Sequence, residues 1–155
     1  MVASPRVRDP QAVLFACGRN SVRSPMAESL LRRMFPHALY VKSAGVKKGE
    51  LDPFAVAVMA ELGQDISGHK PQTFAELEDW EGLNFDLIIT LAPEAHHKAL
   101  ELTRTLAADV EYWPTHDPTG TDGNREQKLQ AYREVCDTLL MRIRKRFSKV
   151  GAASE

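Results

Sequence analysis

Short apolar segments alternate with amphipathic stretches along most of the chain, and this alternation limits the folds that the sequence can adopt. Apolar runs at 12–16, 39–41, 85–91 and 110–113 have the length and composition of buried strands. Between and after them lie stretches with helical periodicity, the longest of which is 124–147. Strands that alternate with helices predict an α/β fold, in which helices cover both faces of a parallel sheet.

Length and charge narrow the class further. A chain of 155 residues is long enough to form one domain with a core of its own. Its 20 basic and 21 acidic side chains give a net charge of -1, so we expect neither nucleic acid nor a membrane surface as the main partner. We expect the domain to span 12–147, between an N-terminal arm at 1–11 and a polar C-terminal tail at 148–155.

The two cysteines, Cys17 and Cys136, are too few for a disulfide scaffold. The first residues lack the apolar segment of a signal peptide, and no apolar run approaches the ~20 residues of a membrane span. We therefore expect a cytoplasmic protein with free thiols, present as a monomer or a weak dimer.

The first predicted strand leads directly into Cys17-Gly-Arg-Asn-Ser-Val-Arg23, a Cys-x5-Arg motif. Its spacing alone says little, because Cys136 and Arg142 repeat it inside a predicted helix. Its context is informative, since the loop lies between a buried strand and a helix that Ser24, as N-cap, and Pro25 are expected to open. The backbone N–H groups of such a loop and the helix dipole together bind anions.

The residue types in this loop suit attack on a tetrahedral oxyanion. Arg23 can bind two anion oxygens at once, and the positive potential of the loop favours the nucleophilic thiolate of Cys17. We therefore expect Cys17 and Arg23 to be catalytic. The remaining loop residues are expected to bind the substrate: Gly18, Arg19, Asn20, Ser21, Val22 and Ser24.

A candidate general acid follows the last predicted strand. Asp117 lies in a segment rich in proline and glycine, 115–123. Parallel sheets gather the carboxyl ends of their strands at one edge, so we expect Asp117 to lie beside the Cys17 loop. A bound phosphate would raise the pKa of this carboxyl and so make it a useful acid. Asp122, in the same segment, is the alternative acid.

The sequence from Val13 to Glu28 resembles the signature of the low-molecular-weight protein tyrosine phosphatases, whose fold the thioredoxin-coupled arsenate reductases share. The resemblance covers about 12–147, because further motifs follow in the family's order: Ser43-Ala-Gly45, Ser67-Gly-His-Lys70, Phe85-Asp-Leu-Ile88 and Asp117-Pro118. It implies a three-layer α/β/α sandwich with a four-stranded parallel sheet of strand order 2-1-3-4. The phosphate loop would follow the first strand.

The resemblance also implies a role for each matching residue. Cys17 would be the nucleophile that forms a phosphocysteine intermediate, and Arg23 would bind the phosphate and stabilise the transition state. Asp117 would protonate the leaving oxygen and then activate water. Ser24 would donate its hydroxyl to the Cys17 thiolate. No metal or cofactor is expected, because Arg23 and the loop amides supply the positive charge.

A further group of residues would hold the loop in shape. The resemblance implies that Asn20 adopts a left-handed backbone conformation, which asparagine tolerates better than most residues. Ser43 and His69 would brace Asn20 and Ser24 from behind the loop.

The loop departs from the family's usual Cys-x-Gly-Asn-x-Cys-Arg. Arg19 stands at the family's glycine position, and Val22 replaces the second cysteine. Without that cysteine, an oxidised Cys17 has no neighbour with which to form a protective disulfide. Arg19 adds positive charge or narrows the pocket.

Two other departures concern the substrate. Thr119-Gly120 follows Asp117-Pro118, where the family's tyrosine phosphatases carry aromatic residues that wall a phosphotyrosine ring. The thioredoxin-coupled reductases need two further cysteines, whereas beyond Cys17 this chain has only Cys136, which is expected in the core.

Three hypotheses follow. The leading one is hydrolysis of a phosphomonoester on a protein, including phosphotyrosine, or on a small molecule. The alternative is an arsenate reductase that uses a low-molecular-weight thiol, since arsenate resembles phosphate and such an enzyme needs only Cys17. The third is a catalytically weak protein that binds phosphate, another oxyanion or a phosphoprotein, suggested by Arg19 and Val22.

Overall fold

A four-stranded parallel sheet forms the centre of the protein. The computed structural model describes residues 10–153, with side chains from 10 to 147. The strand order is β2-β1-β3-β4, as the resemblance implied, and the α/β class is confirmed. The strands are β1 (Ala12–Cys17), β2 (Tyr40–Gly45), β3 (Leu87–Thr90) and β4 (Asp109–Tyr112).

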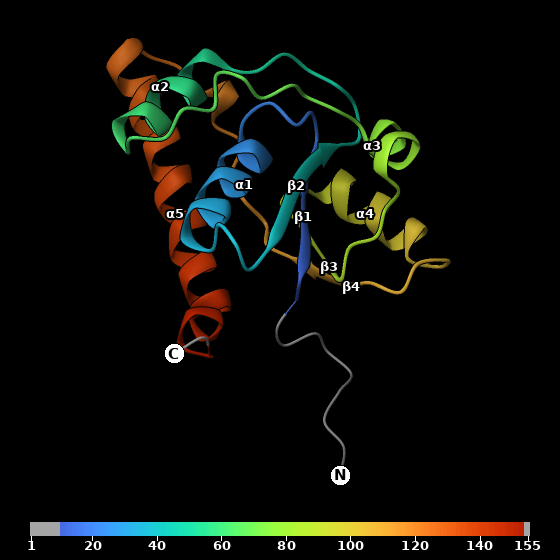
Figure 1. Ribbon diagram of the computed structural model, residues 1–155. Helices are drawn as coiled ribbons and strands as arrows, with labels where there is room; N and C mark the ends of the chain where they lie inside the picture. Colours follow the sequence, from blue (N-terminus) through green and yellow to red (C-terminus); the bar gives the residue numbers. More distant parts are fainter. Residues whose placement is uncertain (1–9, 154–155) are drawn as a thin grey trace.

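Helices cover both faces of this sheet and complete the three layers (Figure 1). On one face lie α1 (Arg23–Met34), α2 (Pro53–Glu61) and α5 (Arg125–Ala153), and on the other lie α3 (Phe74–Glu81) and α4 (Pro93–Leu102). A short 3-10 helix, η1 (Pro118–Gly120), follows β4. The backbone of α5 continues into the segment expected as a polar tail, and most of the expected N-terminal arm lies outside the described residues.

The central strand β1 divides the core in two. Val13 and Phe15 belong to the cluster that packs under α1, α2 and α5, whereas Leu14 and Ala16 belong to the cluster under α3 and α4. Successive side chains of a strand point to opposite faces, and β1 is covered on both. This explains why β1 is an unbroken apolar run in the sequence.

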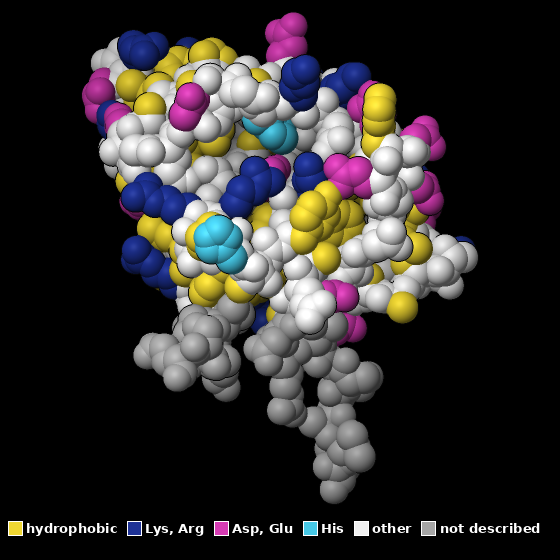
Figure 2. All heavy atoms as spheres, in the orientation of Figure 1, with side chains coloured by type: hydrophobic (Ala, Val, Ile, Leu, Met, Phe, Trp, Pro, Cys, Tyr) yellow, Lys and Arg dark blue, Asp and Glu magenta, His cyan; other side chains and the backbone are white. Residues whose placement is uncertain are grey.

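The surface shows no segregation of charge on the face drawn in Figure 2, where basic and acidic side chains are interspersed. An anion is therefore not attracted to this face as a whole, and its binding has to depend on a local site. Among the described residues, no helix combines the length and the apolarity that crossing a membrane requires.

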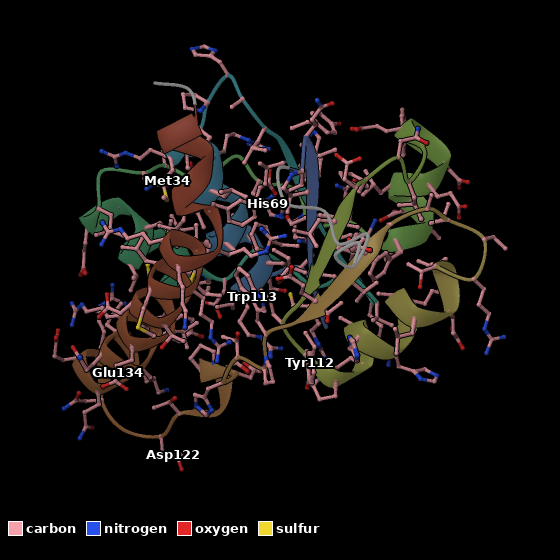
Figure 3. The ribbon with its side chains drawn as sticks, turned by 90° about the horizontal axis from the view of Figure 1, so that it is seen from below. Met34, His69, Tyr112, Trp113, Asp122 and Glu134 are labelled. Atoms are coloured by element: carbon pink, nitrogen blue, oxygen red, sulfur yellow. The ribbon has the colours of Figure 1, made fainter. Side chains whose placement is uncertain are left out.

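The carboxyl edge of the sheet gathers the segments that matter for function. Cys17 ends β1 and is paired in register with Gly45, the last residue of β2. The motif Ser43-Ala-Gly45 therefore lies within β2 rather than after it. Tyr112, the last residue of β4, stacks on a histidine of α4, and Trp113, directly after it, packs edge-to-face on Phe15 (Figure 3). The chain therefore leaves the sheet with one aromatic side chain anchored on each face.

Candidate active site

The loop between β1 and α1 places Cys17 at the base of a cleft of about 1000 Å³. Cys17 is only 2% exposed. The structure corrects one expectation, because α1 begins at Arg23 with Val22 at the N-cap position, and Ser24 lies inside the helix. The Ser24 hydroxyl is not available for capping, since its Oγ lies 2.9 Å from Cys17 Sγ.

Asn20 lies at the centre of a hydrogen-bond network under the loop. Its φ of 58° is the only positive value of a non-glycine residue among the described residues, and its side chain is fully buried. The Gln72 N–H donates to Asn20 Oδ1 at 2.9 Å, which fixes the orientation of the amide because a backbone N–H can only donate. Asn20 Nδ2 therefore donates to Ser24 Oγ and Ser43 Oγ, both at 2.9 Å.

These bonds direct the proton of the Ser24 hydroxyl. Because Ser24 Oγ accepts from Asn20, its own hydrogen is free to point at Cys17 Sγ. The backbone N–H of Asn20 donates to the same sulfur at 3.3 Å. Two donors thus face the sulfur, and this arrangement stabilises negative charge on it.

Behind the loop, the network ends on Glu28, which was not expected to take part. Ser43 donates its hydroxyl to Glu28, and Arg32 pairs with the same carboxylate. His69 lies beside α1 (Figure 3), with Nε2 3.0 Å from Asn20 Oδ1. Burial lowers the pKa of His69, and this effect outweighs the negative charge of Glu28, which raises it. The ring is therefore neutral at neutral pH. Its hydrogen is then on Nε2, as a donor to Asn20.

We expect Asn20→Ala to lower the free energy of unfolding by roughly 2–4 kcal/mol, because alanine is strained at positive φ and leaves buried polar groups without partners. Denaturant unfolding measures this change. Asn84→Ala, at an exposed position, is the control and should change stability by less than about 0.5 kcal/mol. If both variants lowered the free energy of unfolding equally, the proposed role of Asn20 in holding the loop would be wrong.

Arg23 joins the Cys17 loop to the segment after β4. Its side chain is 12% exposed, and Nη1 donates to the backbone oxygen of Thr115 at 3.0 Å. Its Nη2 lies 3.8 Å from Asp117 Oδ2, so the structure brings the predicted arginine and the predicted acid together. Asp122 is exposed, lies on the loop before α5 and points away from the molecule (Figure 3).

Asp117 is about half exposed at the mouth of the cleft. Burial acts to raise its pKa, but hydrogen bonds from the backbone N–H and hydroxyl of Thr119 outweigh it, helped by the charges of Arg23 and His116. The pKa of Asp117 is therefore held below its usual value, and the side chain is a carboxylate in the free cleft. To act as an acid it has to take up a proton when an anion binds to Arg23.

The segment after β2 forms the opposite wall of the cleft. Its backbone follows the Cys17 loop, with hydrogen bonds from Lys47 N to Gly18 O and from Gly49 N to Arg19 O. A Cβ at Gly49 would lie 2.5 Å from Ser21 Oγ and 3.0 Å from Arg19 Cβ, so a side chain there would force Ser21 or Arg19 to move. Ser21 and Arg19 therefore pack directly against this wall.

The lining of the cleft is polar and aliphatic. Of the expected binding residues, Gly18, Arg19, Ser21 and Val22 line it, whereas Asn20 and Ser24 lie beneath the loop in the network described above. None of the described residues that line the cleft is aromatic. The cleft therefore offers no ring on which a phosphotyrosine could stack.

Glu94, which the sequence interpretation missed, also lines the cleft. It lies in the first turn of α4, which follows β3. Its position shortly after the end of a strand could therefore have identified it from the sequence as a candidate site residue. A Cβ on Gly18 would lie 3.2 Å from Glu94 Oε2 and 3.9 Å from Arg23 Nη2. The missing side chain of Gly18 thus leaves the space that the carboxylate and the guanidinium both border.

The second cysteine lies elsewhere. Cys136 is buried in the core, with Sγ 3.8 Å from the sulfur of Met59 in α2, and burial raises the pKa of its thiol to about 11. Neither cysteine is in a disulfide. Within the described residues, no group of three or more His, Cys, Asp or Glu side chains is arranged to hold a metal ion.

Comparisons with known proteins agree with this geometry. Residues 12–154 match the family model described as low molecular weight phosphotyrosine protein phosphatase. The chain is 31% identical over 140 residues to the glutaredoxin arsenate reductase of Synechocystis sp. (90% of this chain, 98% of the relative). It is 34% identical over 142 residues to the arsenate reductase of Bacillus licheniformis (91% and 97%). The crystal structure of the low molecular weight protein tyrosine phosphatase from T. tengcongensis superposes with a TM-score of 0.72 at 28% identity (90% and 99%). The chain belongs to the low-molecular-weight phosphotyrosine protein phosphatase family.

Proposed function

We propose that the protein reduces arsenate, with Cys17 as the nucleophile and a low-molecular-weight thiol as the source of electrons. The observation that carries this proposal is the position of Cys17 in a cleft that no aromatic side chain lines among the described residues, with Ser24 Oγ 2.9 Å from its sulfur. Two of the relatives named above are arsenate reductases, which supports the same reading over the hydrolysis of phosphotyrosine. Free thiols suit a reducing compartment such as the cytoplasm.

In the first step, the Cys17 thiolate attacks the arsenic of arsenate and an S–As bond forms. One arsenate oxygen leaves as water, with its proton supplied from the cleft, where Asp117 is the candidate donor. Arg23 and the loop N–H groups bind the remaining oxygens and their developing charge. Ser24 would steady the sulfur through the hydrogen bond that it donates.

The electrons come from two external thiols. The first thiol attacks Cys17 Sγ, the S–As bonding pair stays with arsenic, and arsenite leaves a mixed disulfide behind. The second thiol attacks that disulfide, which restores Cys17 and releases the oxidised thiol pair. Each turnover thus converts one arsenate and two thiols into one arsenite, one disulfide and one water. An external donor is needed because the only other cysteine, Cys136, is in the core.

Phosphomonoester hydrolysis is the second candidate, and the position of Asp117 beside Arg23 favours it. In that reaction Asp117 would protonate the leaving oxygen of the ester, and water would then hydrolyse a phosphocysteine at Cys17. Both reactions begin with attack by the Cys17 sulfur, on arsenic with loss of water or on phosphorus with loss of the alcohol. They differ in what attacks next, a thiol at the Cys17 sulfur or water at phosphorus.

Asp117→Asn separates these candidates. We expect ester hydrolysis, followed with p-nitrophenyl phosphate, to fall by roughly 100-fold or more, because the ester oxygen leaves poorly without an acid. Arsenate reduction, followed as arsenite formed with glutathione, mycothiol or a glutaredoxin system, should fall less, because arsenate carries hydroxyl protons of its own. Asp122→Asn is the control and should leave both rates within about twofold.

The wild-type assay decides between the proposals. Formation of arsenite that depends on a thiol and on Cys17 supports the reductase. Hydrolysis of phosphate esters with no arsenite formed from any of the thiol donors would overturn it and leave the phosphatase.

A further inference from the structure

Glu94 is an acidic side chain in a cleft that is expected to bind an anion. It lines the same cleft as Cys17 and Arg23, and its Oε2 borders the space above Gly18. In the described part of the chain it has neither an ion pair nor a hydrogen bond, whereas Asp117 faces Arg23 at 3.8 Å. A carboxylate without a cation partner next to a bound anion is repelled by it, unless a hydrogen lies between the two.

The candidate ligands differ in whether they carry that hydrogen. A phosphate monoester above its second pKa of about 6 has three bare oxygens on phosphorus, and these can only accept hydrogen bonds. Sulfate likewise has no hydroxyl at neutral pH. Inorganic arsenate and phosphate keep at least one hydroxyl in both ionic forms present near neutrality. Only these last two can donate a hydrogen bond to Glu94 while their other oxygens face Arg23 and the loop.

We propose that Glu94 is a specificity-determining residue that selects inorganic oxyanions bearing a hydroxyl, arsenate and phosphate, over phosphate monoesters and sulfate. This inference rests on the proposed function and narrows it, since arsenate is then the substrate for which the cleft is built. The exposed Glu94 carboxylate repels an ester dianion and sulfate alike, because neither anion has a hydrogen to donate to it.

The absence of a side chain at Gly18 also contributes to the proposed selectivity. A Cβ there would lie 3.2 Å from Glu94 Oε2, closer than ordinary van der Waals contact, so a side chain would push the carboxylate away from the loop. The backbone of Gly18 has no positive φ, so alanine is compatible with the fold. Gly18→Ala should therefore weaken the selection without removing any charge.

The test compares phosphate with sulfate at about pH 8, where both are mainly dianions and differ chiefly in one hydrogen. Calorimetry measures the Kd of each anion for the wild type, Glu94→Gln and Glu101→Gln. We expect the wild type to bind phosphate at least about tenfold more tightly than sulfate. In Glu94→Gln the ratio should fall to about one to three, because the amide can donate to sulfate as well as accept from phosphate. Glu101→Gln, at the other end of the same helix, should keep the wild-type ratio.

Two results would overturn the inference: a wild type that binds the two anions equally, or a Glu94→Gln variant that keeps the full preference. Neither measurement needs turnover or a thiol. If the preference for phosphate depended on Glu94 but no thiol donor gave arsenite, the proposed reductase function would be wrong and the proposed selectivity of Glu94 would stand. If arsenite formed but Glu94→Gln kept the wild-type ratio of the two Kd values, the reductase function would stand and the selectivity of Glu94 would be wrong.

Discussion

Replacing Cys17 with serine is expected to lower both arsenate reduction and ester hydrolysis by at least about 1000-fold. A serine oxygen is smaller than the sulfur and so introduces no clash, and the partners at this position, Ser24 Oγ and Asn20 N, can still hydrogen-bond to it. Neither partner is a base that could remove the hydroxyl proton, so the bond to arsenic or phosphorus does not form. Phosphate binding, measured by calorimetry, should stay within a few-fold of the wild type.

Cys136→Ala is the matched control for this variant. Both cysteines are 2% exposed, but Cys136 packs in the core against Met59. Turnover with excess thiol should stay within about twofold, and stability should fall by about 1 kcal/mol. If Cys136→Ala abolished thiol-dependent reduction, Cys136 would be a second redox residue and the external-thiol mechanism would be wrong.

Much of the fold can be predicted from local patterns in the sequence. The buried run of β1 and the start of α2, where the Asp52 side chain accepts from Phe54 N at 2.8 Å, follow from residue type and spacing alone. The strand order does not, because it depends on which strands pair across the whole chain. It came from the family resemblance, and the structure confirms it.

The mistaken cap at Ser24 shows where local rules fail. Serine before proline is a good helix-start signal, but here the hydroxyl is taken by Cys17 and Asn20, and the helix begins two residues earlier, with Val22 in place of Ser24 at the N-cap. A tertiary hydrogen bond has outweighed a local preference. Ser43 likewise lies inside β2, rather than after the strand, because it pairs in register with Phe15 of β1.

Gln72 and Glu94, two of the residues missed at the site, have contacts there that are distant in sequence. Gln72 meets Asn20 across 52 positions, and Glu94 borders the space above Gly18 from the first turn of α4, the helix that follows β3. Local spacing carries no such information. For the same reason the sequence left both Asp117 and Asp122 open as the acid, and only the folded chain shows which of them lies beside Arg23.

Arg23→Lys is expected to lower kcat/KM for either reaction by roughly 100- to 1000-fold. Lysine keeps the charge but loses the planar fork that can bind two anion oxygens at once. It also loses the bond from Nη1 to Thr115 O, which holds the segment that carries Asp117 against the loop. The Kd of phosphate should rise as well, so calorimetry and steady-state rates together measure the full effect.

Arg33→Lys is the control that distinguishes the loss of the Arg23 guanidinium from a general effect of replacing an arginine in α1. Arg33 lies in the same helix and also donates from Nη1 to a backbone oxygen, that of Leu62 at 2.8 Å, but it lines a different cleft from Cys17. Its replacement should leave kcat/KM within about twofold. If Arg23→Lys retained activity within fivefold of the control, a point charge and the loop N–H groups would be enough to bind the anion, and the planar guanidinium would not be required. Rescue of Arg23→Lys by guanidinium in solution, with no effect on Arg33→Lys, would instead show that the fork itself is what the reaction requires.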